Sequence, residues 1–235
     1  MVGATAVTYA IVSDAQRRAK RAAEEAKGIL ANKDSNIAQI PVIYGERRVG
    51  GTRVFIANSG SDNTYLYIIL ALSEGEVNSI GDVYLDDDLS TASKFSGLVT
   101  INKHLGTDSQ AADATFIAAN IGWTSAHQLK GTAYLAVRLK WDSDVFSSIP
   151  VINAIVQGRK VYDPRTSTTV YSTNPALCWR DFLTNARFGK GLPVSAIDDT
   201  SVIAAANKCD TLVTPYTGAV QIKLFECNAV ISTSL

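Results

Sequence analysis

Apolar residues recur at two different spacings along this chain of 235 residues, and the change of spacing divides the chain into three parts. In the first part, between residues 11 and 30, apolar residues recur at the spacing of one helix face. Ser13 or Asp14 is placed to cap the start of this predicted helix, and Gly28 or Asn32 lies near its end. Alanine dominates the apolar stripe, so the helix would bury little area alone. We expect it either to pack against other chains or to remain a solvated arm.

Between residues 40 and 162 the pattern changes to that of β-strands. A continuous apolar run at residues 65–72 predicts a strand that is buried on both faces. Residues 132–141 alternate between apolar and mostly polar positions, which predicts the clearest strand of the chain. Its apolar positions are Ala133, Leu135, Val137, Leu139 and Trp141. Shorter apolar segments predict further strands at residues 40–44, 53–57, 80–85, 98–104 and 151–162.

Helical spacing returns in the last part of the chain. Asn174 followed by Pro175 predicts a helix start, because asparagine caps free backbone N–H groups and proline fits the first helical turn. We expect Gly189 to end this helix, and Trp179 and Phe182 to be core residues that pack it on a sheet. The predicted apolar face comprises Cys178, Trp179, Phe182, Leu183 and Ala186.

Two further elements follow this helix. Asp198 or Asp199 is placed to open a second helix. Residues 220–231 predict a final strand whose apolar positions change face near Leu224 and Phe225, as at a β-bulge. No partner segment follows this strand, and an unpaired strand invites pairing with another chain. We therefore expect either a longer product or a separate polypeptide that completes the domain.

Together these elements predict an α+β fold that is mainly β. We expect an N-terminal helical arm at residues 1–35 and a β-rich domain at residues 36–172. Residues 173–235, with two helices and a strand, are expected to form an incomplete or inserted subdomain.

Composition narrows the possible functions. The 22 basic and 22 acidic residues give a formal net charge of zero, whereas a general nucleic-acid binder would carry a basic excess. No apolar run approaches the roughly 18 residues of a membrane span, and the start lacks the basic region and cleavage site of a signal peptide. Cys178, Cys209 and Cys227 lie far apart in the sequence, which favours small buried thiols in a chain made in a reducing cytoplasm.

Two segments superficially resemble ligand-binding motifs. Residues 45–52 differ by one residue from a phosphate-binding loop, but Gly51 stands where the lysine should be and a strand, not a helix, is predicted to follow. We interpret this segment as a glycine turn. Asp86, Asp87 and Asp88 are consecutive, whereas a calcium loop alternates its oxygen ligands, so we expect a solvated turn that binds no essential metal.

The two histidines, His104 and His127, have no partners at metal-binding spacing, and we expect both to be structural hydrogen-bonding residues. Ser125 lies near His127 in the sequence, but two residues do not establish a catalytic triad. No catalytic, cofactor-binding or metal-binding residue is therefore predicted. We expect no cofactor, and we expect that the chain is not an enzyme.

Six stretches of the sequence resemble stretches that occur in the same order in the tail tip attachment protein (host-specificity protein J) family of siphophages, the long-tailed bacteriophages. The resemblance covers roughly residues 40–235, and it rests on the shared order of the stretches. The most specific is NPALCWRDFLTNARFGKG at residues 174–191, with an asparagine-proline start, an aromatic helix and a Phe-Gly-x-Gly exit. The other five are IPVIYGERRVGGTRVF at residues 40–55, LALSEGEVNSIGDVYL at 70–85, HLGTDSQAAD at 104–113, GWTSAHQLKGTAYLAVRLK at 122–140 and VQGRKVYDPR at 156–165.

The resemblance implies a tail hub built from β-barrel-like tube domains with an α+β insertion. Such hubs form a ring at the virion tail tip, which predicts a homotrimer of this chain assembled in the host cytoplasm. The ring would close the tail tube, contact the tape measure protein, distal tail and other tail tip proteins, and meet DNA only in transit during ejection. The family continues into fibronectin-like and receptor-binding regions that this chain lacks, which argues against direct receptor recognition by these residues.

Two alternatives belong to other functional classes. A tail-associated cell-wall hydrolase would need a pair of carboxylates or a metal site. A carbohydrate-binding β module would present aromatic side chains in loops. Trp141 and Trp179 fall on apolar faces of predicted elements, so Trp123 is the one loop tryptophan that fits this second alternative.

Overall fold

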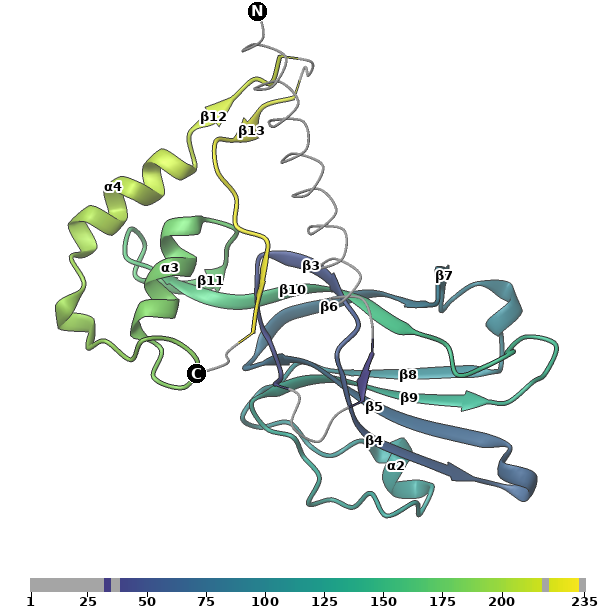
Figure 1. Cartoon of the computed structure of the whole chain (residues 1–235). Helices are drawn as coiled ribbons and strands as arrows, with labels where there is room; N and C mark the ends of the chain where they lie inside the picture. The colour runs from purple at the N-terminus through teal and green to yellow at the C-terminus, as the bar shows by residue number, and fades with distance from the viewer. Residues whose placement is uncertain (1–31, 35–38, 217–219, 233–235) are drawn as a thin grey trace, which may run out of the picture.

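The computed structural model describes residues 32–34, 39–216 and 220–232. The helix predicted between residues 11 and 30 lies outside the described residues. Within them the fold is mainly β, with a smaller helical part near the C-terminus, as the sequence predicts (Figure 1). All seven strand segments predicted between residues 40 and 162 contain a strand.

Two sheets of five strands each form the β part among the described residues. The first sheet has the order β1 (Lys33–Asp34), β4 (Thr52–Ser59), β5 (Tyr65–Glu74), β9 (Thr132–Lys140) and β8 (Val99–His104). The second has the order β11 (Thr168–Tyr171), β10 (Ile152–Asp163), β6 (Val77–Leu85) and β7 (Asp88–Leu89), with β3 (Glu46–Val49) also paired to β10. Three short 3-10 turns lie in the connections, at Ser61–Asn63, Ser93–Phe95 and Val194–Ala196.

The main hydrophobic core lies between the two sheets. Leu70 of β5 and Leu135 of β9 pack there against Val83 of β6 and Val156 of β10, and all four are almost completely buried. The chain passes from the first sheet to the second through the short connection between β5 and β6, where Gly75 has a φ of 80°. The barrel-like arrangement implied by the resemblance is therefore realised as two packed sheets, and the described strands do not close into a barrel.

The outer face of the first sheet is covered as well. Tyr67 of β5 and Tyr134 of β9 pack there against Phe116 of the short helix α2 (Ala114–Ala118) and against Trp123 in the following loop. This second cluster confirms that residues 65–72 form a strand buried on both faces. It also corrects the expectation for Trp123, which is 5% exposed and therefore not presented by its loop.

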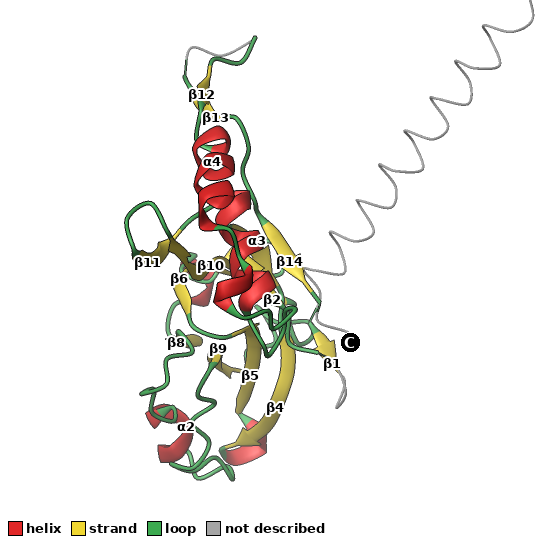
Figure 2. Cartoon of the chain, turned by 90° about the vertical axis from the view of Figure 1, so that its left-hand side faces the viewer, coloured by secondary structure: helices red, strands yellow, loops and turns green. Residues whose placement is uncertain are grey.

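The C-terminal part places two helices beside β10 and β2 (Val42–Tyr44) (Figure 2). Helix α3 (Pro175–Thr184) begins as predicted, since the Asn174 side chain accepts a hydrogen bond from the Ala176 amide at 3.0 Å. Helix α4 (Asp199–Cys209) begins in the same way, with Asp198 accepting from the Thr200 amide at 3.0 Å. Among the described residues, neither these helices nor α2 are long and apolar enough to cross a membrane.

The prediction of one continuous strand at residues 220–231 is wrong. It divides into β13 (Ile222–Lys223), paired with β12 (Leu212–Val213), and β14 (Ala229–Ile231), paired with β2. The change of face near Leu224 marks the point where the chain leaves one partner for the other, so it is not a bulge within one ladder. The expectation that this strand lacks a partner is also wrong, because β14 pairs antiparallel with β2.

The predicted apolar face of α3 is rotated in the structure. Trp179 is 59% exposed, whereas Leu177, Cys178 and Arg180 are buried. The cause is Arg180, whose guanidinium bonds Asp199 of α4 at 2.7 Å and lies 4.7 Å from the Tyr162 ring centroid. Trp179 therefore points away from the core and stacks on the partly buried Phe182, with 5.6 Å between ring centroids.

The end of α3 also differs from the prediction. The helix ends at Thr184, five residues before Gly189. Residues 185–191 turn back onto it, with the Lys190 amide donating to the Phe182 carbonyl at 3.0 Å. A side chain at position 189 would collide with that carbonyl, because an added Cβ would lie 1.8 Å from its oxygen. This return turn carries Arg187 and Phe188 toward the sheets.

Candidate functional site

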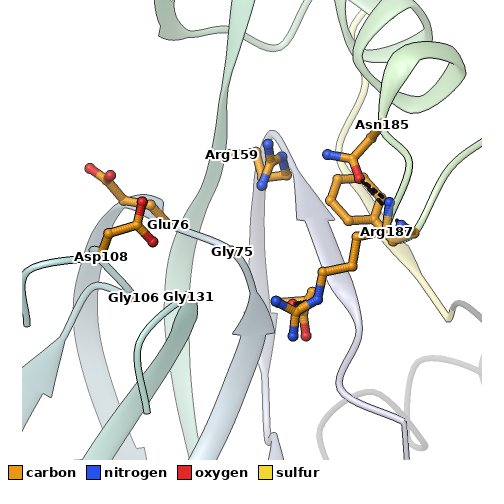
Figure 3. Close-up of a pocket in the computed structure, with 10 residues that line it drawn as sticks. Gly75, Glu76, Gly106, Asp108, Gly131, Arg159, Asn185 and Arg187 are labelled. Carbon is orange, nitrogen blue, oxygen red and sulfur yellow. Dashed lines mark hydrogen bonds and ion pairs between the residues drawn. The ribbon is translucent and has the colours of Figure 1, made fainter. Parts of the chain in front are cut away.

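A cavity of about 250 Å³ opens where β5 turns into β6 and where the return turn after α3 approaches the sheets (Figure 3). Charged side chains and glycines dominate its lining. The lining residues are Glu74, Gly75, Glu76, Gly106, Asp108, Gly131, Arg159, Asn185, Arg187 and Phe188.

Backbone hydrogen bonds hold the loops that form the floor of this cavity. The Glu74 amide donates to the Pro41 carbonyl at 2.8 Å, and the Gly75 amide donates to the Gly131 carbonyl at 2.7 Å. Gly106 allows the close approach of these segments, because a Cβ at this position would lie 2.7 Å from the Gly75 oxygen. Its φ of 85° also favours glycine. The floor is thus built from tightly apposed backbone.

Two ion pairs connect this floor to the helical part. Arg187 lies with its Nε 2.6 Å from Oε1 of Glu74, whose side chain is 14% exposed. Arg159 of β10 lies with its Nε 3.2 Å from Oδ2 of Asp181 on α3. The Arg159 guanidinium also faces the Phe188 ring, with 4.8 Å to the centroid. Each arginine is therefore engaged by a carboxylate from another element.

Asp181 is the centre of the second of these contacts. The Tyr44 hydroxyl of β2 donates to the same Oδ2 atom at 2.5 Å. Burial, followed by the charge of Asp181, raises the pKa of Tyr44 far above its usual range, so Tyr44 stays protonated and donates. Asp181 thereby joins β2, β10 and α3 in one network. The arrangement stabilises the junction between sheets and helices.

Two of the three carboxylates that line the cavity are engaged in ion pairs. Glu74 is paired with Arg187, and Glu76 is paired with Lys160 at 3.1 Å. Among the described residues that line it there is no hydroxyl, thiol or imidazole side chain to act as a nucleophile or proton carrier. The chemistry of the lining suits the positioning of backbone and the recognition of charge.

The histidines lie away from this lining and have structural contacts. The Nε2 atom of His104 lies 3.0 Å from Oδ2 of the buried Asp113, and the His104 ring stacks on Tyr134 at 4.2 Å. The Thr124 amide donates to Nδ1 of His127 at 2.9 Å, so the histidine bonds threonine rather than Ser125. Both histidines thus make the hydrogen bonds that were predicted for them.

The two motif-like segments also take the structures expected of them. Gly51 has a φ of 72° in a turn between β3 and β4, and a strand follows it. Asp86 and Asp87 form the turn between β6 and β7, Asp88 begins β7, and the three engage separate partners. Asp86 accepts from the Val151 amide at 2.9 Å, Asp87 lies 3.9 Å from Arg48, and Asp88 pairs with Lys94.

The stretches that resemble the tail tip family meet at the cavity. All ten lining residues belong to five of the six stretches, and the sixth, residues 40–55, supplies Pro41 and Tyr44 beside it. Sequence reasoning did not single out Glu74, Arg159 or Arg187. The available signal was a charge within or next to an apolar segment, as for Arg159 in the predicted strand at residues 151–162.

Several large apolar residues of the C-terminal part are exposed. Trp179, Tyr216, Val220 and Phe225 are among those that are more than half exposed. Trp141 at the end of β9 is 40% exposed and contacts Phe146, with 5.9 Å between ring centroids.

The proteins that this chain resembles include a curated phage protein and a chain of solved structure. The chain is 24% identical over 247 residues to baseplate hub protein pb3 of Escherichia phage T5, a match that covers 78% of this chain and 26% of the phage protein. It therefore spans about a quarter of that relative's length. A chain in the virion of native gene transfer agent (GTA) particle aligns over 55% of this chain and 28% of its own, with a TM-score of 0.42 and 21% identity. No family model matches the sequence.

Proposed function

We propose that this chain is a structural, non-enzymatic subunit of a bacteriophage tail hub and a component of the virion. The observation that carries the proposal is the similarity to a phage baseplate hub protein, which extends over 78% of the chain. The cavity supports it, because two of its arginines, Arg159 and Arg187, form ion pairs that join the sheets to the helical part. A subunit that transmits load through a particle needs such a rigid junction more than it needs a reactive cluster.

The finer assignment is to the hub portion of the tail tip attachment (host-specificity protein J) family. In this role the chain assembles in the host cytoplasm as a homotrimeric ring at the tail tip and closes the tail tube. Its partners are copies of itself, distal tail and other tail tip proteins, and the tape measure protein. DNA is met only in transit during ejection, which fits the formal net charge of zero, because a neutral channel does not capture phosphates. The ring takes part in host attachment.

Reconstruction of the intact virion tests this role. We expect density for this fold at the tail tip, arranged around the tail axis as three copies, with the exposed apolar side chains of the C-terminal part covered by neighbours. Density in the capsid, or a single peripheral copy, would refute the proposal. Virions that lack the chain but keep complete, closed and infectious tails would refute it as well.

The carbohydrate-binding alternative is kept because Trp141 and Trp179 are exposed. Aromatic rings exposed in this way can stack on sugar faces. Titration of the chain with host surface polysaccharide, in parallel with Trp141→Ala and Trp179→Ala variants, tests this alternative. In a calorimetric titration, saturable binding by the parent chain that either variant abolishes would favour this alternative. The absence of a heat change with the parent chain and with both variants would exclude it. For the hydrolase alternative, cleared zones on a cell-wall zymogram would be the decisive result.

A further inference from the structure

Two of the three cysteines, distant in the sequence, meet in the C-terminal part. Cys178 lies on α3 and is 3% exposed. Cys227 lies in the segment between β13 and β14 and packs against the same apolar cluster that contains Cys178. Both are free thiols in the structure, as is Cys209 at the end of α4.

The backbone fixes this meeting point from both sides. The Cys227 amide donates to the Thr173 carbonyl at 2.6 Å, immediately before α3. The Cys178 thiol lies 3.7 Å from the carbonyl of Ser172, the preceding residue in the same connection between β11 and α3. On its other side, Cys227 approaches β2 so closely that a Cβ at Gly45 would lie 2.0 Å from the Cys227 oxygen. The two thiols are therefore brought together by ordered main chain.

The electrostatic properties of the two thiols differ in a useful way. The adjoining Cys227 thiol, and then burial, raise the pKa of Cys178. The Cys178 thiol lowers the pKa of Cys227, although burial opposes this. Cys227 is also the more exposed of the two. A partly exposed thiol with a lowered pKa is the one that attacks first, and its buried neighbour is placed to resolve the product.

We propose that Cys178 and Cys227 form a reversible intramolecular disulfide that clamps the segment before β14 onto α3. The co-reactant is a small disulfide of the glutathione class. The Cys227 thiolate attacks one of its sulfurs and releases one small thiol. The Cys178 thiol then loses its proton and attacks the Cys227 sulfur of the mixed disulfide, which releases the second small thiol. The protein loses two electrons and two protons, and the small disulfide is reduced.

The location gives this bond a structural consequence. The loop that it closes contains α4 and the ribbon of β12 and β13, which carries exposed apolar residues. A cross-link between residues 178 and 227 restricts the unfolded chain. In the folded chain it joins the two ends of this loop to each other, beside the start of α3. The inference does not depend on the proposed hub function, because it rests on the meeting of the two thiols.

Thiol counting on the full chain is the direct test. The protein is equilibrated with reduced and oxidised glutathione, quenched with an alkylating reagent and digested for mass spectrometry. We expect Cys178 and Cys227 to lose reactivity together and to appear in one cross-linked peptide, while Cys209 stays alkylated. The oxidised protein should unfold at a temperature higher by roughly 5 °C, and dithiothreitol should reverse the rise.

Matched variants make the test specific. Cys209→Ser should behave like the parent protein, whereas Cys178→Ser and Cys227→Ser should each abolish the cross-link and the thermal shift. In Cys178→Ser, the remaining Cys227 should accumulate as a mixed disulfide with glutathione. Independent oxidation of the three thiols in the folded parent protein, or a cross-link through Cys209, would overturn the proposal without any variant having to fold.

Discussion

The guanidinium of Arg159, in the middle of a strand of the second sheet, lies 3.2 Å from the Asp181 carboxylate on α3. Asp181 also accepts from the Tyr44 hydroxyl, so one carboxylate joins two strands and a helix. Both members of the ion pair are largely buried, with side chains 19% and 16% exposed. Removal of either partner would leave a charge that is poorly solvated and unpaired.

We therefore expect Asp181→Ala to lower the free energy of unfolding by about 3 kcal/mol. The substitution leaves the Arg159 charge without its carboxylate and removes the hydrogen-bond acceptor of Tyr44. Urea denaturation followed by circular dichroism measures this change. Glu76→Gln is the matched control, since its ion pair with Lys160 is exposed at both ends and should be worth less than about 1 kcal/mol. Equal losses in the two variants would mean that the Asp181 network does not stabilise the junction.

A second prediction concerns the two aromatic environments. Trp179→Ala should cost less than about 1 kcal/mol in the isolated chain, because the ring is 59% exposed. Phe116→Ala should cost roughly 3–5 kcal/mol, because that ring is 1% exposed within the outer cluster. Chemical denaturation of both variants gives the comparison. A large loss for Trp179→Ala would restore the sequence-based expectation that its ring lies in the core.

A third prediction follows from Asp113, which caps α2. Burial raises the pKa of Asp113, but hydrogen bonds from His104, Asn102 and the Phe116 amide outweigh it and hold the pKa below its usual range. A carboxylate with a depressed folded pKa stabilises the fold above its unfolded pKa of about 3.9, and this contribution is lost as the pH falls through the folded pKa.

Unfolding free energies measured from about pH 7 down to about pH 2 test this contribution, which is lost as the pH falls from the unfolded pKa through the folded pKa. We expect stability to fall in the acid range, and the fall to be smaller in Asp113→Asn, which has no carboxylate to protonate. The variant should also be less stable at neutral pH, since the charge-assisted bonds are gone. An unchanged acid slope would show that other carboxylates are responsible.

The fourth prediction tests the backbone floor of the cavity. Gly106→Ala and Gly97→Ala share a positive φ, of 85° and 74°, so both carry a conformational cost. The added methyl group meets the Gly75 oxygen at 2.7 Å in the first case and nothing within 4 Å in the second. Gly106→Ala should therefore be the more destabilising by more than about 1 kcal/mol in urea denaturation. Similar losses would show that the floor relaxes to accept a side chain.

Sequence patterns were sufficient where local chemistry decides the structure. The caps at Asn174 and Asp198 mark their helix starts correctly, because the cap needs only its own side chain and the next two residues. The apolar run at residues 65–72 indicates burial on both faces without any knowledge of what covers it. The turn at Gly51 follows in the same way from backbone conformation.

Sequence patterns failed where a residue far away in the sequence decides the position of a side chain or the pairing of a strand. Trp179 would lie in the core by its apolar character, but the bond between Arg180 and Asp199 on the next helix rotates it outward. Trp123 lies in a loop, as predicted, but its side chain is not presented there, because Phe116 and the outer face of the first sheet cover it. The short strand β3 was missed altogether, since its polar residues are ordered by pairing with β10.

The sequence by itself determined the mainly β composition of the fold, the positions of most strands, the two helix starts and the order of the stretches that resemble a tail hub. Only the tertiary structure decided that these stretches meet at one cavity, that Arg159 and Asp181 face each other, and that Cys178 and Cys227 share a cluster. The physical reason is the distance along the sequence over which each interaction acts. Periodicity and capping act over a few residues, whereas ion pairs and thiol contacts depend on which segments the packed core brings together.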